Sequence, residues 1–172
     1  MTQISPWSGR LGDEQMVVVR AACGDDLDAL REFGHEAVPA AYAGVIEPEL
    51  VDLLLAKRWT GEALAPAIAA GRTMVAYEAD RLVGVCTVGM HEGALVVWKL
   101  YVRPGDHGRG IGSALLAVAR ERADRAQVRL RLTFTEGNRY ADAFCRRHGF
   151  VEVGREEQAG MPDLVWMAEE GA

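Results

Sequence analysis

The stretch KLYVRPGDHGRGIGSALLAVARERA, residues 99–123, runs from β-forming residues through a glycine-rich turn into an amphipathic, arginine-rich pattern. Four glycines fall within eight positions there: Gly105, Gly108, Gly110 and Gly112. A plain strand-to-helix turn needs one glycine, so four indicate a backbone that lets a ligand approach closely. Free N–H groups from Gly108 to Ser113, at the positive end of a helix, would suit a pyrophosphate. We therefore predict an anion-binding strand–turn–helix.

Two common phosphate-binding motifs do not describe this turn. A Walker loop needs lysine directly after its last glycine, and Ile111 stands after Gly110. A Rossmann fingerprint needs G-x-G-x-x-G early in a βαβ unit, whereas GRGIG follows a run of antiparallel strands. The remaining interpretation is a cradle of backbone N–H groups, with His107 and Arg109 as further donors beside it.

The sequence on both sides of the turn predicts alternating helices and strands. Two-residue gaps separate the three β-forming runs before it, which is typical of antiparallel hairpins. Asp25 and Asp26, Pro48, and Thr60 mark helix starts, and Pro39 is expected to interrupt or bend the first helix. This order predicts an α+β layered domain. The expected strands are 17–22, 73–79, 82–91, 94–102, 128–134 and two near the C-terminus. The expected helices begin at about residues 25, 48 and 60, a fourth follows the glycine turn and ends at about 126, and a fifth is 138–149.

Composition indicates one ordinary globular domain. The chain has 172 residues, of which 49% are hydrophobic and 26% charged. We expect residues 1–15 to form a loose tail and residues 16–172 a single domain. Neither a signal peptide nor a membrane span is recognisable, which favours a cytoplasmic protein that contacts no membrane. The three widely spaced cysteines are typical of reduced thiols, so neither disulfides nor a metal site is expected.

Charge is unevenly distributed along the chain. Residues 1–98 carry 7 Lys and Arg against 14 Asp and Glu, whereas residues 99–131 carry 8 basic residues against 3 acidic ones. A basic segment around the glycine turn suits a polyanionic small molecule, and the acidic remainder argues against nucleic acid. His35 and His91 have no partners at ligand spacing and are expected to be packed or surface residues.

Two motifs together resemble the GCN5-related N-acetyltransferases (GNAT). LYVRP at Leu100–Pro104, followed by Gly110 and Gly112, is similar to that family's motif A, although His107 stands where Gln or Arg is usual. A second pattern, N-x-x-A-x-x-F-x-x-x-x-G-F, begins at Asn138. The resemblance implies the GNAT fold, whose sheet is mixed, mostly antiparallel, about seven-stranded and flanked by helices. It also implies acetyl-CoA as co-substrate.

The resemblance further implies the residues that bind the coenzyme. Leu100 and Val102 would offer backbone hydrogen bonds to the pantetheine arm, and Asn138 would hold that arm from the other side. The implied coenzyme-binding residues are Leu100, Tyr101, Val102, His107, Gly108, Arg109, Gly110, Ile111, Gly112, Ser113, Asn138 and Phe144.

The acceptor implied by the resemblance is a primary amine of a small molecule or peptide. Residues 40–68 resemble the helical region of spermidine/spermine-type bacterial acetyltransferases, and the acidic excess of residues 1–98 favours a cationic acceptor. Polyamine-like amines, antibiotic amines and protein N-termini remain open, and a homodimer is a family-level expectation. Two other classes also remain: a catalytically degenerate acyl-CoA-binding module and a nucleotide-binding protein.

Acetyl transfer needs a neutral amine and a proton for the leaving thiolate. The family's usual base position maps onto Val96, and its usual acid position, after Phe144, holds Cys145. Candidate catalytic residues are Cys145 and Tyr140 as acids, and Glu78, Glu92 and Glu136 as bases acting with water.

Strict alternation along residues 94–102 predicts which side chains share a face of that strand. It places Val96, Trp98, Leu100 and Val102 on one face, with Lys99 and Tyr101 on the other. Trp98 then becomes the candidate acceptor-binding residue, because an indole can pack an aliphatic amine or stack on a cation.

Overall fold

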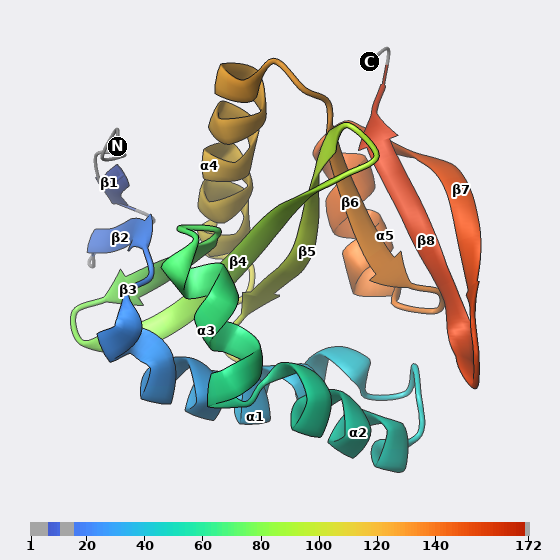
Figure 1. The fold of residues 1–172 in the computed structure, drawn as a ribbon, viewed down its shortest axis with the longest axis horizontal. Helices are drawn as coiled ribbons and strands as arrows, with labels where there is room; N and C mark the ends of the chain where they lie inside the picture. Colours follow the sequence, from blue (N-terminus) through green and yellow to red (C-terminus); the bar gives the residue numbers. More distant parts are fainter. Residues whose placement is uncertain (1–6, 11–15, 171–172) are drawn as a thin grey trace.

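The computed structural model describes residues 7–10 and 16–170, and its strands form one eight-stranded sheet in the order β1-β2-β3-β4-β5-β6-β8-β7 (Figure 1). The strands are β1 (Trp7–Arg10), β2 (Met16–Ala21), β3 (Thr73–Glu78), β4 (Arg81–His91), β5 (Ala94–Val102), β6 (Leu130–Thr135), β7 (Phe150–Gln158) and β8 (Met161–Glu169). The helices are η1 (Gly24–Asp26), α1 (Leu27–Tyr42), α2 (Pro48–Arg58), α3 (Gly61–Ala69), α4 (Ile111–Ala126) and α5 (Arg139–Arg147).

The sheet is mixed, as predicted. β5 and β6 are parallel, and every other neighbouring pair is antiparallel. The seven predicted strands correspond to β2–β8 and the order of elements is confirmed, so the chain has the expected α+β fold. One expectation differs: residues 7–10 form β1, which pairs with β2, while the rest of the expected loose tail lies outside the described residues.

Two hydrophobic cores lie on opposite faces of the sheet (Figure 1). One face packs against α4 and α5, with Leu115, Leu116 and Cys145 among the buried side chains. The other packs against α1, α2 and α3, with Phe33 and Trp59 at its centre. The residues that connect β5 to α4 therefore lie between two well-packed layers.

Local sequence explains most helix ends. Pro48 occupies the first turn of α2, where its missing N–H costs nothing, and the Thr60 hydroxyl caps α3 by accepting the Ala63 N–H at 3.2 Å. Of the two predicted effects of Pro39, to interrupt or to bend the first helix, interruption is wrong, because α1 continues to Tyr42. Pro39 lies one turn from the helix end and is exposed, so it removes one hydrogen bond without ending the helix.

Asp26 joins β2, β3 and the start of α1. Its buried carboxylate accepts two hydrogen bonds from Arg20, at 2.7 and 2.8 Å, and one from the Tyr77 hydroxyl at 3.0 Å. Burial by itself would raise the pKa of Asp26, but hydrogen bonds from Arg20, the Cys23 N–H and Tyr77 outweigh it and hold that pKa well below its usual value. The charged carboxylate therefore stabilises the fold.

We expect Asp26→Asn to lower the free energy of unfolding at pH 7 by about 2 kcal/mol, since Arg20 is partly exposed and the pair is partly screened. Because the pKa is lower in the folded state, this contribution is present above the unfolded pKa and is lost as the pH falls below about 4. Urea unfolding of both proteins between pH 7 and pH 3 measures the difference. A gap that stays constant over that range would contradict the role of the charge.

Candidate active site

β5 and β6 diverge after a short parallel pairing. They pair at Leu95–Leu130, Val96–Arg131 and Val97–Leu132, and no further pair follows within the described residues. β5 then continues along β4, while β6 continues along β8. The two strands form a wedge that opens toward the β5–α4 turn, and its apex lies at Val97 (Figure 1).

The wedge exposes backbone hydrogen-bonding groups of β5. Arg103 donates its N–H to the Val83 carbonyl of β4 at 2.8 Å. Because successive residues of a strand direct their backbone groups to opposite edges, those of Leu100 and Val102 point away from β4 into the wedge. This is the arrangement that the sequence predicts for these two residues, and it offers donors and acceptors to an extended amide-containing chain.

A β-bulge at Trp98 changes the predicted faces of β5. Thr87 of β4 lies opposite Lys99 and Val88 lies opposite Val97, so Trp98 is the additional residue. Beyond the bulge Leu100 and Val102 pack on the α4 side, whereas Lys99 and Tyr101 contact Trp59 on the α1–α3 side. The prediction that Trp98 shares a face with Leu100 is therefore wrong, because a bulge breaks strict alternation.

The glycine turn has the geometry of an anion cradle. Gly110 is the N-cap of α4 with φ of +82°, a conformation that favours glycine. The first α4 hydrogen bond within the helix runs from the Ala114 N–H to the Gly110 carbonyl, so the N–H groups of residues 111–113 precede it. A Cβ on Gly112 would lie 3.1 Å from the Phe144 ring, so this glycine lets α5 pack closely against the cradle.

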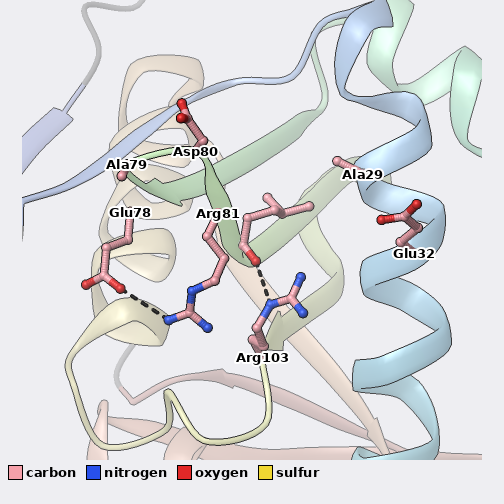
Figure 2. Close-up of a pocket in the computed structure, with 8 residues that line it drawn as sticks. Ala29, Glu32, Glu78, Ala79, Asp80, Arg81 and Arg103 are labelled. Carbon is pink, nitrogen blue, oxygen red and sulfur yellow. Dashed lines mark hydrogen bonds and ion pairs between the residues drawn. The ribbon is translucent and has the colours of Figure 1, made fainter.

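Ion pairs between the β5–α4 turn and the β3–β4 hairpin fix the conformation of the turn. The Arg109 guanidinium donates to Asp106 at 2.6 Å and also to Glu78. Arg81 donates to Asp106 at 3.0 Å and to Glu78 at 3.2 Å, and Figure 2 shows the second of these contacts. Both carboxylates are buried. Hydrogen bonding to Arg109 outweighs burial and lowers the pKa of Glu78 below its ordinary value. The Arg109 side chain is thus engaged in anchoring the loop, and Glu78 lies at the cradle end of the wedge, away from its apex.

A surface hollow of about 500 Å³ lies beside this anchor (Figure 2). Glu78 and Arg81 belong both to the ion-pair anchor and to the lining of the hollow. Arg103 also lines the hollow and donates a 2.8 Å hydrogen bond to the Leu82 carbonyl. Leu100 and Val102 do not line it, so the hollow is separate from the wedge. Its lining residues are Ala29, Glu32, Glu78, Ala79, Asp80, Arg81, Leu82 and Arg103.

His107 and Tyr140 join the β5–α4 turn to α5. The His107 Nε2 lies 3.0 Å from the Val102 carbonyl oxygen, and the two rings stack with centroids 4.9 Å apart. Tyr140 is 57% exposed. The sequence names His107 as a coenzyme-binding residue and Tyr140 as a catalytic acid; the structure places both at the wide end of the wedge.

The start of α5 and the start of α4 lie together. Asn138 caps α5, because its Oδ1 accepts the Ala141 N–H at 3.0 Å, and only its Nδ2 group is left to reach a ligand. Phe144 packs on Gly112 and on the His148 ring. His148 in turn lies 3.0 Å from the Ser113 hydroxyl. These predicted coenzyme-binding residues are thus brought to one end of the wedge.

Cys145 is a core residue. It is 3% exposed and belongs to the cluster that includes α4, and burial raises the pKa of its thiol to about 12. An ordinary thiol has a pKa of ~8.5. Cys145 is therefore a weaker acid than an ordinary thiol and is poorly suited to protonate a leaving thiolate. The structure therefore offers no support for Cys145 as the catalytic acid.

We expect one of the three thiols to react rapidly with a thiol reagent such as DTNB at pH 8. Cys23 is exposed, whereas Cys86 and Cys145 are buried and burial raises the pKa of each to about 12. The two buried thiols should react at least about 100-fold more slowly in the native protein. All three should react alike in guanidinium chloride, and a second fast thiol in the native protein would contradict the burial of Cys145.

The other two predicted bases lie away from the apex. Glu92 is in the β4–β5 turn, before the paired residues Leu95–Val97 of β5, and its carboxylate lies 3.9 Å from Arg131. Glu136 accepts a hydrogen bond from Arg155. Val96 is completely buried next to the apex and cannot take a proton. Among the described residues, none of the predicted carboxylates therefore lies at the point where β5 and β6 separate.

Trp98 belongs to an aromatic cluster on the α1–α3 side of the sheet. Its ring is 5.6 Å from His91 and 5.7 Å from Trp166 between centroids, and His91 stacks on Trp166. Trp98 is 39% exposed, so part of the indole is open to a ligand. His91 is a surface residue, as predicted, although its participation in this cluster was not.

Sequence reasoning missed the cations that surround the bulge. The Lys99 ammonium lies over the Trp59 ring, 5.6 Å from its centroid, and burial and the charges of Arg58 and Arg72 lower the pKa of Lys99. No sequence signal marks the bulge that brings Trp98 to the same side of the sheet as Lys99, since β5 contains neither glycine nor proline. Arg58 and Arg72 come from the ends of α2 and α3, which sequence spacing could not place beside β5.

The described residues contain no cluster of three or more His, Cys, Asp or Glu that could hold a metal ion. None of the helices in the described part of the chain is long and apolar enough to cross a membrane.

Comparison with protein families identifies one matching domain. Residues 69–152 match the model of the acetyltransferase (GNAT) domain, and this range contains β3, β4, β5, the cradle, β6 and α5. No curated protein matches the chain by sequence.

Solved structures with the same fold cover most of the chain. The PaiA N-acetyltransferase from Thermoplasma acidophilum, in complex with coenzyme A, is 20% identical with a TM-score of 0.77, over 87% of this chain and 97% of that one. The ribosomal-protein-S18-alanine N-acetyltransferase from Escherichia coli is 18% identical with a TM-score of 0.67, over 90% and 93%. Nourseothricin acetyltransferase is 30% identical over 56% of this chain and 63% of that one, with a TM-score of 0.54.

Proposed function

Because the chain has the GNAT acyl-CoA N-acyltransferase fold and matches the GNAT acetyltransferase domain over residues 69–152, we propose that this protein is an enzyme. It transfers the acetyl group of acetyl-CoA to a primary amine of a small molecule or peptide. The observation that carries this proposal is the wedge between β5 and β6, which leads from the glycine cradle to the bulge at Trp98.

In this proposal the coenzyme occupies the wedge lengthwise. The N–H groups of Gly108, Gly110 and residues 111–113 bind its pyrophosphate at the positive end of α4. The pantetheine arm follows the edge of β5 at Leu100 and Val102 that faces away from β4, where His107 also contacts the Val102 carbonyl, with Phe144 and the Asn138 side-chain amide on its other side. An arm laid in this direction brings the thioester to the apex, beside Trp98.

The reaction is a direct transfer. The neutral amine nitrogen attacks the thioester carbonyl carbon, a C–N bond forms, the C–S bond breaks, and the proton lost by the amine balances the departing thiolate as CoA-SH. Holding the amine and the thioester in line is itself worth several kcal/mol, about 7 in favourable cases. We infer that water carries the proton away from the amine, since the predicted carboxylates lie elsewhere.

We expect Glu92→Gln and Glu136→Gln to leave the pH profile of kcat/KM unchanged, with kcat/KM within about twofold, because neither lies near the apex. Glu78→Gln should instead raise KM for acetyl-CoA without shifting the profile, because it weakens the anchor of Arg109. Steady-state kinetics from pH 6 to 9 measure both effects. Loss of the acidic limb, the fall in kcat/KM at low pH, in any of the three variants would identify that residue as the base.

The test of the proposed function combines binding and turnover. Acetyl-CoA should raise the melting temperature, and CoA thiol should be released when acetyl-CoA is incubated with a panel of amines. Acetyl-CoA binding without turnover on any amine would favour a degenerate acyl-CoA-binding module, to which Val96 and the buried Cys145 at the usual catalytic positions also point. Stabilisation by ATP or NAD but not by acetyl-CoA would overturn both readings.

A further inference from the structure

Three cations converge on the α1–α3 side of the bulge. Lys99 is on β5 and lies over the Trp59 ring. Arg58 directly precedes Trp59 at the end of α2, and its charge acts on both Lys99 and Tyr101. Arg72 approaches from the chain before β3: a Cβ built on Gly89 would lie 3.2 Å from both its guanidinium and the Trp98 Nε1. The three cations therefore border the position where a thioester would react.

These cations are not neutralised by the protein. Within the described part of the chain, Lys99, Arg58 and Arg72 form no ion pair with a carboxylate. Two further charged groups near the bulge have partners within the protein. Arg131 lies 3.9 Å from Glu92, and the Glu156 carboxylate accepts the Trp166 indole N–H at 3.2 Å.

We propose that the acceptor is a small amine that also carries a carboxylate, which Lys99, Arg58 and Arg72 bind while the Trp98 indole packs against the rest of the molecule. This inference rests on the proposed function, and it narrows the acceptors that the sequence leaves open. The acidic excess of residues 1–98, which favours a cationic acceptor, does not extend to the bulge.

Two physical arguments select this class. A carboxylate gains charge-assisted hydrogen bonds from side chains that have no partner of their own, whereas a polyamine would bring further positive charge into the same partly desolvated region. The attacking amine must also be neutral, and nearby cations favour loss of the proton from an ammonium group. The same three cations therefore bind the carboxylate of such an acceptor and favour the neutral form of its amine.

The experiment compares acceptors that differ in one charge. CoA release is measured with each of the common amino acids and with its carboxamide, which keeps the amine and the side chain but loses the charge. For the best amino acid we expect at least a tenfold higher kcat/KM than for its amide. The α-amide of glutamate, which keeps only the side-chain carboxylate, shows whether a more distant carboxylate is accepted, and spermidine represents the polycations.

Variants assign the preference to the three cations. Lys99→Met keeps the length of the side chain and should reduce the acid-to-amide preference below threefold, and Arg72→Met should reduce it as well. Lys57→Met removes the same charge from the neighbouring exposed position of α2 and should leave the preference unchanged. If Lys99→Met does not fold, judged by circular dichroism, Lys99→Gln and Arg72→Met replace it.

A second measurement does not depend on turnover. In the presence of CoA, N-acetyl amino acids should bind at least tenfold more tightly than their amides by calorimetry, and Lys99→Met should abolish the difference. If N-acetyl amino acids bind more tightly than their amides but no amine is acetylated, the proposed carboxylate site is upheld and the proposed transferase activity is overturned. Turnover of amides or spermidine as fast as of amino acids, or a preference that survives Lys99→Met, would overturn the carboxylate site and leave the transferase standing.

Discussion

A Gly110→Glu variant is expected to lose at least about 100-fold in affinity for CoA and acetyl-CoA, which corresponds to about 2.7 kcal/mol. Gly110 is the N-cap of α4 at φ +82°, directly before the N–H groups of residues 111–113. A glutamate there brings a Cβ and a negative charge to the position proposed for the pyrophosphate, so steric exclusion and charge repulsion act together. Calorimetry with CoA measures the loss.

The matched control is Gly160→Glu in the β7–β8 turn. Gly160 has φ of +74°, and a Cβ added to it would meet no atom within 4 Å, so this variant carries similar backbone strain, about 1–2 kcal/mol, and the same added charge. It should match Gly110→Glu in melting temperature and retain normal CoA affinity. If Gly110→Glu folds and binds CoA normally, the turn is not the coenzyme cradle.

Gly34→Ala is expected to lower the free energy of unfolding by about 3 kcal/mol. A Cβ on Gly34 would lie 2.2 Å from the Trp59 ring, and both residues are buried between α1 and α2. Ala in place of Gly inside an ordinary helix stabilises it by about 1 kcal/mol, so the expected sign is reversed by overpacking. Urea unfolding followed by tryptophan fluorescence and circular dichroism gives the change.

Two further variants test this explanation. Gly154→Ala, where nothing lies within 4 Å of a Cβ, should change stability by less than about 0.5 kcal/mol. Gly34→Ala combined with Trp59→Leu should recover part of the loss relative to Trp59→Leu alone, because the smaller side chain leaves room. Equal destabilisation by Gly34→Ala in both backgrounds would rule out the contact with Trp59 as its cause.

The donor end of the wedge was predictable because its signals are local. The glycine turn and the β-forming run before it lie within a few residues of each other, and the turn predicts both the strand-to-helix geometry and backbone donors. The hairpins were predictable for the same reason, since two-residue gaps at 80–81 and 92–93 predict their connections, and the first turn lies one residue earlier in the structure, at 79–80.

The acceptor side was not predictable, because it depends on register and long-range packing. Alternation along β5 holds on each side of the bulge but not across it, so Lys99 and Tyr101 lie opposite to Leu100 as predicted, whereas Trp98 does not share the face of Leu100. The ion pairs of Glu78 and Arg109 join residues 31 positions apart, so the sequence could not show that each already has a partner. A candidate base and a candidate anion donor thus form a structural anchor instead.

The contrast between the two ends of the wedge has a consequence for how such a protein can diversify. The proposed coenzyme cradle is one continuous segment, residues 99–113, and its glycines, ion pairs and α5 contacts constrain one another. The cations beside the bulge come instead from α2, the chain before β3, and β5, and Arg58 and Arg72 are exposed side chains. Under the proposed function, single substitutions there would alter the preferred acceptor while the donor stays unchanged. New acceptor specificities are therefore separated by few mutational steps, whereas a change of donor would require rebuilding the whole turn.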